Sequence, residues 1–245
     1  SRRFLSRHCP LDLKGQGDSF LSAQGAARSF WATYLDQCFW IRWEQCSPSF
    51  REVGLTIRIP IGGIGFRAPG IDHWGALIKN PNYVLPTEPS PEQPKGVGQC
   101  LPATERRRAT PVTRLALDLA IEAAGARRTD DLSAVFCSSG GEVTVVHQIF
   151  CMLAEGDTAL SPTAFHNSVH NAAAGYWSIA SGSPYAADSL CAFDDSFGAG
   201  LAECCLRYAE GQRNLLLVAY DIPPPHPISL HRRIDNAMGG ALLLG

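Results

Sequence analysis

The sequence predicts an α/β fold in which a sheet lies between two layers of helices. From residue 55 onward, short apolar segments typical of strands alternate with longer segments of helical periodicity, and Gly or Pro marks most of the boundaries between them. Strands that alternate with helices are joined by right-handed crossovers, so we expect a mainly parallel sheet covered on both faces.

The first elements follow from local signals. Residues 55–61 alternate apolar and polar side chains and lead into glycines at 62, 63 and 65, which predicts a strand that enters a tight turn. Residues 81–104 are rich in Pro, Gly and Glu, as surface loops are. Thr110 followed by Pro111 is a strong helix start, and Gly125 is suited to end that helix.

The second half continues the alternation. Residues 132–137 predict a buried strand, and residues 138–141 predict a sharp turn. Helices are expected over 143–154 and 166–181, then a short strand to Cys191, a helix over 196–210 and a strand over 214–220. Three prolines at 223–225 break the chain before a last apolar segment, residues 239–244.

Composition excludes some function classes. The chain has 245 residues, 45% of them hydrophobic and 18% charged, with a formal net charge of −2, which gives no electrostatic reason to expect binding to nucleic acid. Residues 106–108 are three arginines, interpreted as a solvated lead-in to a helix, with contact to an acidic partner as the alternative. No segment reaches the roughly 18 apolar residues of a membrane-spanning helix.

The cysteines and the N-terminus suggest the setting of the protein. Nine cysteines without a CxxC pair, several inside apolar segments, favour free thiols in a reducing cytosol, so we expect a cytoplasmic protein. Residues 1–54 hold three of the five Trp and show no clear periodicity, and the first Met is Met152. We interpret them as an unassigned extension upstream of the true start, with a genuine N-terminal subdomain as the alternative; the domain proper is residues 55–245.

A strand-turn-helix elbow is the main candidate for chemistry. The expected strand turns abruptly at Leu190-Cys191-Ala192 into a helix rich in small residues. An elbow of this kind places one side chain at a helix N-terminus, where backbone N–H groups stabilise a thiolate or an oxyanion. The turn at 138–141 lacks the Lys of a phosphate-binding loop, so no nucleotide is expected there.

From residue 55 to the end, the order of elements resembles the N-terminal half of a β-ketoacyl synthase, a member of the thiolase-like superfamily. The segment SPTAFHNSVHNAAAGYWSI resembles the family pattern S-P-x(n)-N-x-A-A-G-x-x-S-I that leads to the nucleophile, and residues 191–200 fall on the nucleophile elbow. The sequence segments HNSVHN and SLCAFD are most similar to those of the chain-length-factor-like subunits of aryl polyene gene clusters. The resemblance implies a thiolase-like fold layered helix, sheet, helix.

The departures from the family concern catalysis. The family uses an elbow Cys to carry the acyl chain, and two His, or a His and an Asn, from its C-terminal half to drive condensation. The sequence ends where that half would begin, and His226 and His231 lack the family's neighbouring residues. Counting back from Gly200 places the nucleophile position on Ala192, whereas counting from the strand places it on Cys191.

The resemblance therefore implies a non-catalytic, chain-length-factor-like subunit. It would form a heterodimer with a full-length ketosynthase, meet acyl carrier protein through that complex, and serve fatty acid or polyketide biosynthesis of the aryl polyene type, with no cofactor. One alternative is an acyltransferase or ketosynthase-type enzyme that uses Cys191 as the acyl-carrying nucleophile. Another is a truncated remnant without activity.

The polar residues near the elbow have two interpretations. His166 and His170 stand four apart on an expected helix, the spacing at which two imidazoles share a metal, but no third ligand has a position, so no metal is expected. A subunit interface is the preferred place for five residues: His166, Asn167, His170, Asn171 and Phe193. Asp194 and Asp195 are expected to cap the helix after the elbow rather than to act as catalytic acids.

Overall fold

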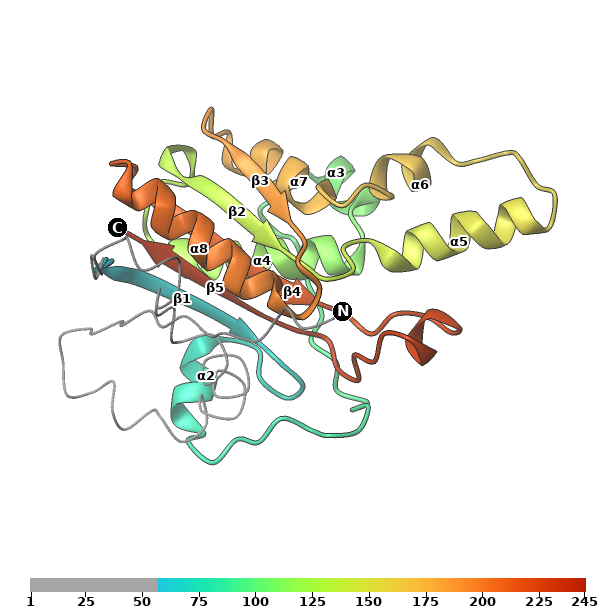
Figure 1. The fold of residues 1–245 in the computed structure, drawn as a ribbon, viewed down its shortest axis with the longest axis horizontal. Helices are drawn as coiled ribbons and strands as arrows, with labels where there is room; N and C mark the ends of the chain where they lie inside the picture. Colours follow the sequence, from blue (N-terminus) through green and yellow to red (C-terminus); the bar gives the residue numbers. More distant parts are fainter. Residues whose placement is uncertain (1–56) are drawn as a thin grey trace, which may run out of the picture.

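A five-stranded sheet forms the centre of the computed structural model, which describes residues 57–245 (Figure 1). The expected N-terminal extension, residues 1–54, lies outside the described residues. The strand order is β1-β5-β4-β2-β3. The strands are β1 (Ile61–Arg67), β2 (Ser133–Cys137), β3 (Ala187–Leu190), β4 (Leu215–Asp221) and β5 (Met238–Leu244).

The sheet is mixed, so the expectation of a mainly parallel sheet is wrong for its second half. β2 pairs in parallel with β3 and β4, whereas β5 pairs antiparallel with both β4 and β1. A parallel neighbour requires a crossover, usually a helix. The segment between β4 and β5 contains only the short 3-10 helix Ile228–Leu230, and the chain turns back on itself there.

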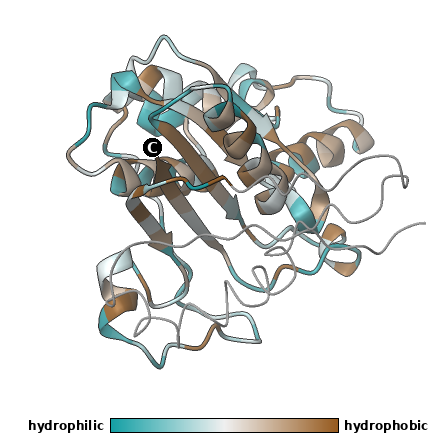
Figure 2. Ribbon diagram, turned by 60° about the vertical axis from the view of Figure 1, so that its left-hand side comes forward, coloured by the Kyte–Doolittle hydropathy of each residue, from teal (hydrophilic) through white to brown (hydrophobic). Residues whose placement is uncertain are grey.

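Helices cover both faces of the sheet, which confirms the α/β class and the helix, sheet, helix layering. α4 (Pro111–Ala124) and α7 (Ala172–Ser181) lie on one face, where Phe136 and Trp177 belong to the larger core cluster. α8 (Ser196–Ala209) lies on the other face, against Val135 and Leu217. The central strands are coloured hydrophobic in Figure 2, as strands buried on both faces should be.

Local signals set the ends of α4 as predicted. The Thr110 hydroxyl oxygen accepts a hydrogen bond from the Thr113 N–H at 3.1 Å, and Pro111 occupies the first helical position. Gly125 ends the helix with φ of +57°, a conformation that disfavours residues with a Cβ.

The glycines at 62, 63 and 65 lie within strand β1, not in a turn after it, which corrects the prediction. Gly63 and Gly65 point to the same side, where the backbone of α4 crosses them. A Cβ on Gly63 would stand 2.0 Å from the Ala123 carbonyl oxygen, and one on Gly65 would stand 2.4 Å from the Leu119 carbonyl oxygen. The glycines are there because helix and strand pack backbone to backbone.

The predicted helix over 143–154 is confirmed as α5 (Val143–Ala154), but the single helix over 166–181 is wrong. The structure has α6 (Pro162–Asn167), a break, and then α7. In the break, the His170 imidazole reaches back so that its Nε2 lies 2.9 Å from the Ser138 carbonyl oxygen. His166 and His170 therefore do not share one helix, and the spacing argument for a shared metal no longer applies.

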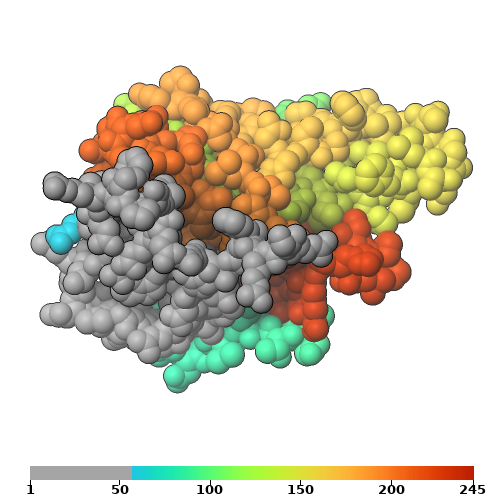
Figure 3. Space-filling view, in the orientation of Figure 1, coloured from blue at the N-terminus to red at the C-terminus, as the bar shows by residue number. Residues whose placement is uncertain are grey.

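Residues 143–167 form an arm that projects beyond the sheet. In Figures 1 and 3 the arm is the yellow extension formed by α5, the loop after it and α6. Val145 is the only buried residue of α5, although that helix is strongly apolar. The arm thus exposes apolar side chains to solvent.

The loop predicted over 81–104 is irregular up to α3 (Ala103–Arg108), which begins at its end; α2 (Trp74–Lys79) precedes it. Asn236, which is buried, anchors this loop through hydrogen bonds of both its side-chain amide nitrogen and its amide oxygen. Its Nδ2 donates to the Pro86 and Glu88 carbonyl oxygens at 2.9 and 3.1 Å, and its Oδ1 accepts from the Ser90 N–H at 2.8 Å. Within the part of the chain that the structure describes, no helix is long and apolar enough to cross a membrane.

Candidate functional site

The elbow after β3 bends most sharply at Phe193, whose φ is +54°. A positive φ is strained for a bulky side chain and has to be held by its surroundings. The Ser196 hydroxyl supplies part of that support, because it donates to the Phe193 carbonyl oxygen at 2.7 Å and accepts from the Ala192 N–H at 3.0 Å. Helix α8 starts directly afterwards, at Ser196.

Phe193 is also held from outside the elbow. The guanidinium carbon of Arg232 lies 4.1 Å from the centroid of the Phe193 ring, a cation–π contact, and Arg232 forms an ion pair with Asp194. Asp194 therefore does not cap α8, and Asp195, at the N-cap position, makes no side-chain capping hydrogen bond. The expectation that these two acids cap the helix is wrong, because Arg232 recruits the first of them.

Cys191 lies before the bend and is exposed. Its thiol donates a hydrogen bond to the Ser139 carbonyl oxygen at 3.4 Å. Among residues 57–245, no imidazole or carboxylate is hydrogen-bonded to Cys191. Ala192, the other position suggested for a nucleophile, is exposed and carries no reactive group.

The turn at 138–141 is organised by Asp221, the last residue of β4. One carboxylate oxygen of Asp221 accepts from the Ser138 hydroxyl at 2.9 Å and from the Ser139 N–H at 3.0 Å, with the Gly140 N–H at 3.4 Å. The N–H groups of this turn thus already hold an internal carboxylate. Burial raises the pKa of Asp221, although these hydrogen bonds act in the opposite direction.

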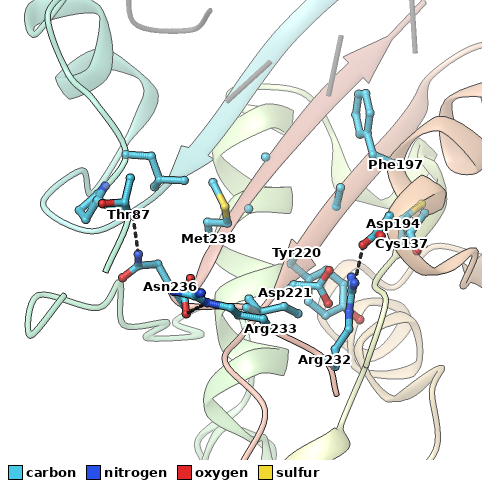
Figure 4. A pocket seen from close by; sticks show the side chains of 18 of the residues that line it. Thr87, Cys137, Asp194, Phe197, Tyr220, Asp221, Arg232, Arg233, Asn236 and Met238 are labelled. Carbon is cyan, nitrogen blue, oxygen red and sulfur yellow. Dashed lines mark hydrogen bonds and ion pairs between the residues drawn. The ribbon is translucent and has the colours of Figure 1, made fainter. Parts of the chain in front are cut away.

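A cavity of about 510 Å³ opens beside the elbow at the carboxyl ends of β2 and β4 (Figure 4). Apolar side chains such as Leu85, Phe197 and Met238 line it, together with Asp221 and the Arg232–Asp194 ion pair. Cys191 is not among the lining residues. The cavity and the exposed thiol are therefore separate features.

The five residues expected at an interface lie in different environments. His170 holds the turn at Ser138, and Asn167 is buried, with its Nδ2 donating to the Arg108 carbonyl oxygen at 2.8 Å. His166 is exposed and stands edge-on to the Tyr176 ring, with 5.6 Å between the centroids. Asn171 and Phe193 are exposed. Asn167 and His170 thus fasten the base of the arm, while the other three are exposed, and their place at an interface stays a prediction.

Glu142 is a second partly enclosed carboxylate at the base of the arm. Its Oε1 accepts hydrogen bonds from the Thr110 and Thr113 hydroxyls at 2.5 and 2.6 Å. Burial raises its pKa despite these two bonds.

The sequence reasoning missed Asp221, Ser196 and Arg232. For Asp221 a signal existed, since it is an acid at the carboxyl end of a buried strand and directly precedes the proline-rich break. Arg232 gave no signal, because it lies 38 residues after its partner Asp194. In the described part of the chain, no group of three or more His, Cys, Asp or Glu could hold a metal ion, and His226 and His231 are exposed.

Comparisons with known proteins show the family of the chain. The family model described as Beta-ketoacyl synthase, N-terminal domain, matches residues 77–244. No curated protein matches the chain.

Solved structures give further similarities. One is a ketosynthase in complex with its chain length factor from Xenorhabdus doucetiae, with 28% sequence identity and a TM-score of 0.65. That match covers 76% of this chain and 78% of the matched chain, so the two chains have similar lengths. A β-ketoacyl synthase from Burkholderia phymatum STM815 has 12% identity and a TM-score of 0.56, with 76% of this chain and 58% of that chain covered.

The ishigamide ketosynthase/chain length factor has 14% identity and a TM-score of 0.59, with 75% of this chain and 60% of that chain covered. The chain therefore spans less than two thirds of the last two proteins, whose similarity concerns the fold.

Proposed function

The chain belongs to the β-ketoacyl synthase N-terminal domain family, and on that premise we propose that it is a non-catalytic, chain-length-factor-like partner of a ketosynthase. The observation that carries the proposal is its similarity, over about three quarters of both chains, to a structure of a ketosynthase in complex with its chain length factor. Residues 77–244, which the family model matches, contain the elbow, the arm and all of β2 to β5.

The elbow supports a non-catalytic role. An acyl-carrying Cys has to be activated by a base or by its setting, and it has to face the space that the substrate occupies. The Cys191 thiol instead donates to the Ser139 carbonyl oxygen and lies outside the cavity at the elbow. The strained position at the bend holds Phe193, which has no nucleophilic group.

The arm and strand β3 support pairing with another chain. Among the described strands, β3 lies at one edge of the sheet, with only β2 beside it. Exposed strand edges and exposed apolar surface favour association. The large apolar side chains exposed on or beside the arm are Phe150, Leu153, Phe165 and Val169.

In the proposed heterodimer, the ketosynthase supplies the nucleophile and the proton-transferring groups. This chain would cover the ketosynthase with its arm and elbow face and help to wall the channel that holds the growing acyl chain, and so set product length. The complex would meet acyl carrier protein and serve fatty acid or polyketide biosynthesis of the aryl polyene type, in the cytoplasm.

A matched pair of substitutions tests the pairing surface. Leu153 on the arm and Ile78 on α2 are each 51% exposed and each lie on a helix, but α2 lies beside β1, at the opposite edge of the sheet from β3. With the chain co-expressed with a partner ketosynthase, we expect Leu153→Asp to weaken the complex by about 30-fold, the loss typical of one buried hot-spot side chain. Ile78→Asp should leave the affinity unchanged.

Size-exclusion chromatography and titration calorimetry would measure this difference. Equal affinities for the two variants would contradict the proposed surface. The enzymatic alternative has its own test, in which the isolated chain is incubated with an acyl carrier protein thioester. Acyl mass added at Cys191 would contradict the non-catalytic role.

A further inference from the structure

We infer that Asp221 is the positioning residue for the arm: it fixes the direction in which residues 143–167 leave the sheet. The inference rests on the proposed function in one respect, namely that the arm is part of the surface that meets the ketosynthase. The inference is based on the contact between the end of β4 and the turn at 138–141.

The turn at 138–141, followed by Glu142 at the N-cap of α5, connects β2 to α5, so its shape sets the direction of the arm. Asp221 holds it through the Ser138 hydroxyl and the Ser139 and Gly140 N–H groups. The Ser138 hydroxyl oxygen also accepts from the Gly141 N–H at 2.7 Å, so one carboxylate orders all four residues of the turn. A carboxylate that accepts several N–H and O–H bonds makes stronger hydrogen bonds than a neutral acceptor.

The carbonyl side of the same turn ties in the two neighbouring segments. His170, which follows the arm, meets the Ser138 carbonyl oxygen, and Cys191 of the elbow donates to the Ser139 carbonyl oxygen. Gly141 has φ of +51° and is buried against the His170 ring. The outgoing base of the arm, its returning base and the elbow therefore meet on one turn, and Asp221 holds that turn against the sheet.

Asp118 offers a matched control. Its carboxylate, on α4, likewise accepts from two consecutive backbone N–H groups, those of Val97 and Gly98 at 2.6 and 2.9 Å, in the loop that precedes α3. Asp118→Ala and Asp221→Ala thus remove the same chemical group from two residues that each hold a different loop, the first on α4 and the second at the end of β4. Asp221→Asn keeps a side-chain oxygen at the position of Oδ1, the carboxylate oxygen that makes most of the bonds, and serves as the conservative variant.

The experiment is amide hydrogen exchange of the full chain, read by mass spectrometry. We expect Asp221→Ala to speed exchange in residues 143–167 by about tenfold or more, while exchange in α4 and β5 stays as in the wild type. Asp118→Ala should leave the arm unchanged, and Asp221→Asn should stay close to the wild type. The affinity for the ketosynthase should fall for Asp221→Ala only.

Three outcomes overturn the inference. The exchange rate of the arm in Asp221→Ala could equal the rate in Asp118→Ala, or the exchange rate in α4 and β5 could rise as much as the rate in the arm. The third outcome is an arm that exchanges as fast in Asp221→Asn as in Asp221→Ala. A loosened arm with unchanged affinity refutes its link to pairing. If the wild-type chain binds no ketosynthase, the proposed function fails while the exchange result still decides the role of Asp221.

Discussion

Replacing Gly63 by Ala should force α4 away from the sheet. The added Cβ would lie 2.0 Å from the Ala123 carbonyl oxygen, whereas carbon and oxygen atoms in contact are about 3.3 Å apart. The helix backbone would therefore have to retreat by roughly 1.3 Å, because no side-chain rotation can relieve a clash between two backbones. α4 packs on β1, β4 and β5, so its movement opens a gap over the larger core cluster.

We expect Gly63→Ala to lower the free energy of unfolding by about 3 kcal/mol, the upper end of overpacking costs. Gly62→Ala is the control, since its Cβ would meet the Leu243 side chain at 3.4 Å and the Arg127 Nη2 at 3.5 Å, both ordinary contacts with side chains. That variant should lie within about 1 kcal/mol of the wild type, because Ala also restricts the unfolded chain.

Urea unfolding followed by circular dichroism measures both variants. With a slope of about 3 kcal/mol per molar urea, the midpoint for Gly63→Ala should fall by about 1 M. If the two variants unfold at the same urea concentration, the close approach of α4 to β1 is not what places a glycine there.

Two further predictions follow from buried ionisable groups. Burial raises the pKa of Glu142 above its ordinary 4.5, so the folded state binds its proton more tightly, and the free energy of unfolding relative to Glu142→Gln should fall as the pH rises from about 4 to neutrality; a flat or rising difference in urea titrations would refute this. Burial, with the Asp118 charge as a smaller cause, raises the pKa of the Cys100 thiol from 9.0 to about 11, which lowers its thiolate fraction at pH 8 about a hundredfold. Iodoacetamide should therefore label Cys100 about a hundred times more slowly in the folded chain than in the urea-unfolded chain, as judged by peptide mass spectrometry, and equal rates would contradict the burial argument.

Predictions that depended on neighbouring residues in the sequence were accurate. The capping hydroxyl of Thr110, the proline after it and Gly125 set the ends of α4 by themselves, since a helix end is satisfied by groups within a few residues. The bounds of α5 were also predictable, because an apolar segment of helical length is followed by Gly156 with its positive φ. The family resemblance rested on the same kind of local pattern and is confirmed over residues 77–244.

Predictions that depended on distant residues failed. The glycines of β1 were assigned to a turn, since clustered glycines are typical of turns. They are needed instead because they accommodate the backbone of α4, which lies about 60 residues further on. The helix over 166–181 is interrupted between α6 and α7, at the point where His170 meets a carbonyl group 32 residues earlier. Asp194 was assigned to a helix cap because it directly precedes a helix. Its actual partner, Arg232, is far away in the sequence and could not be predicted from local pattern.

The sequence by itself thus determined the α/β class, the positions of most helices and strands, and the membership of a β-ketoacyl synthase family. Each of these depends on periodicity, capping and short patterns, which are properties of consecutive residues. Only the tertiary structure decided the antiparallel β5, the arm and its anchoring at Asp221, and the separation of Cys191 from the cavity. These depend on which backbone and side-chain groups meet across the sheet, and such meetings are set by packing and hydrogen bonding between segments that the sequence keeps apart.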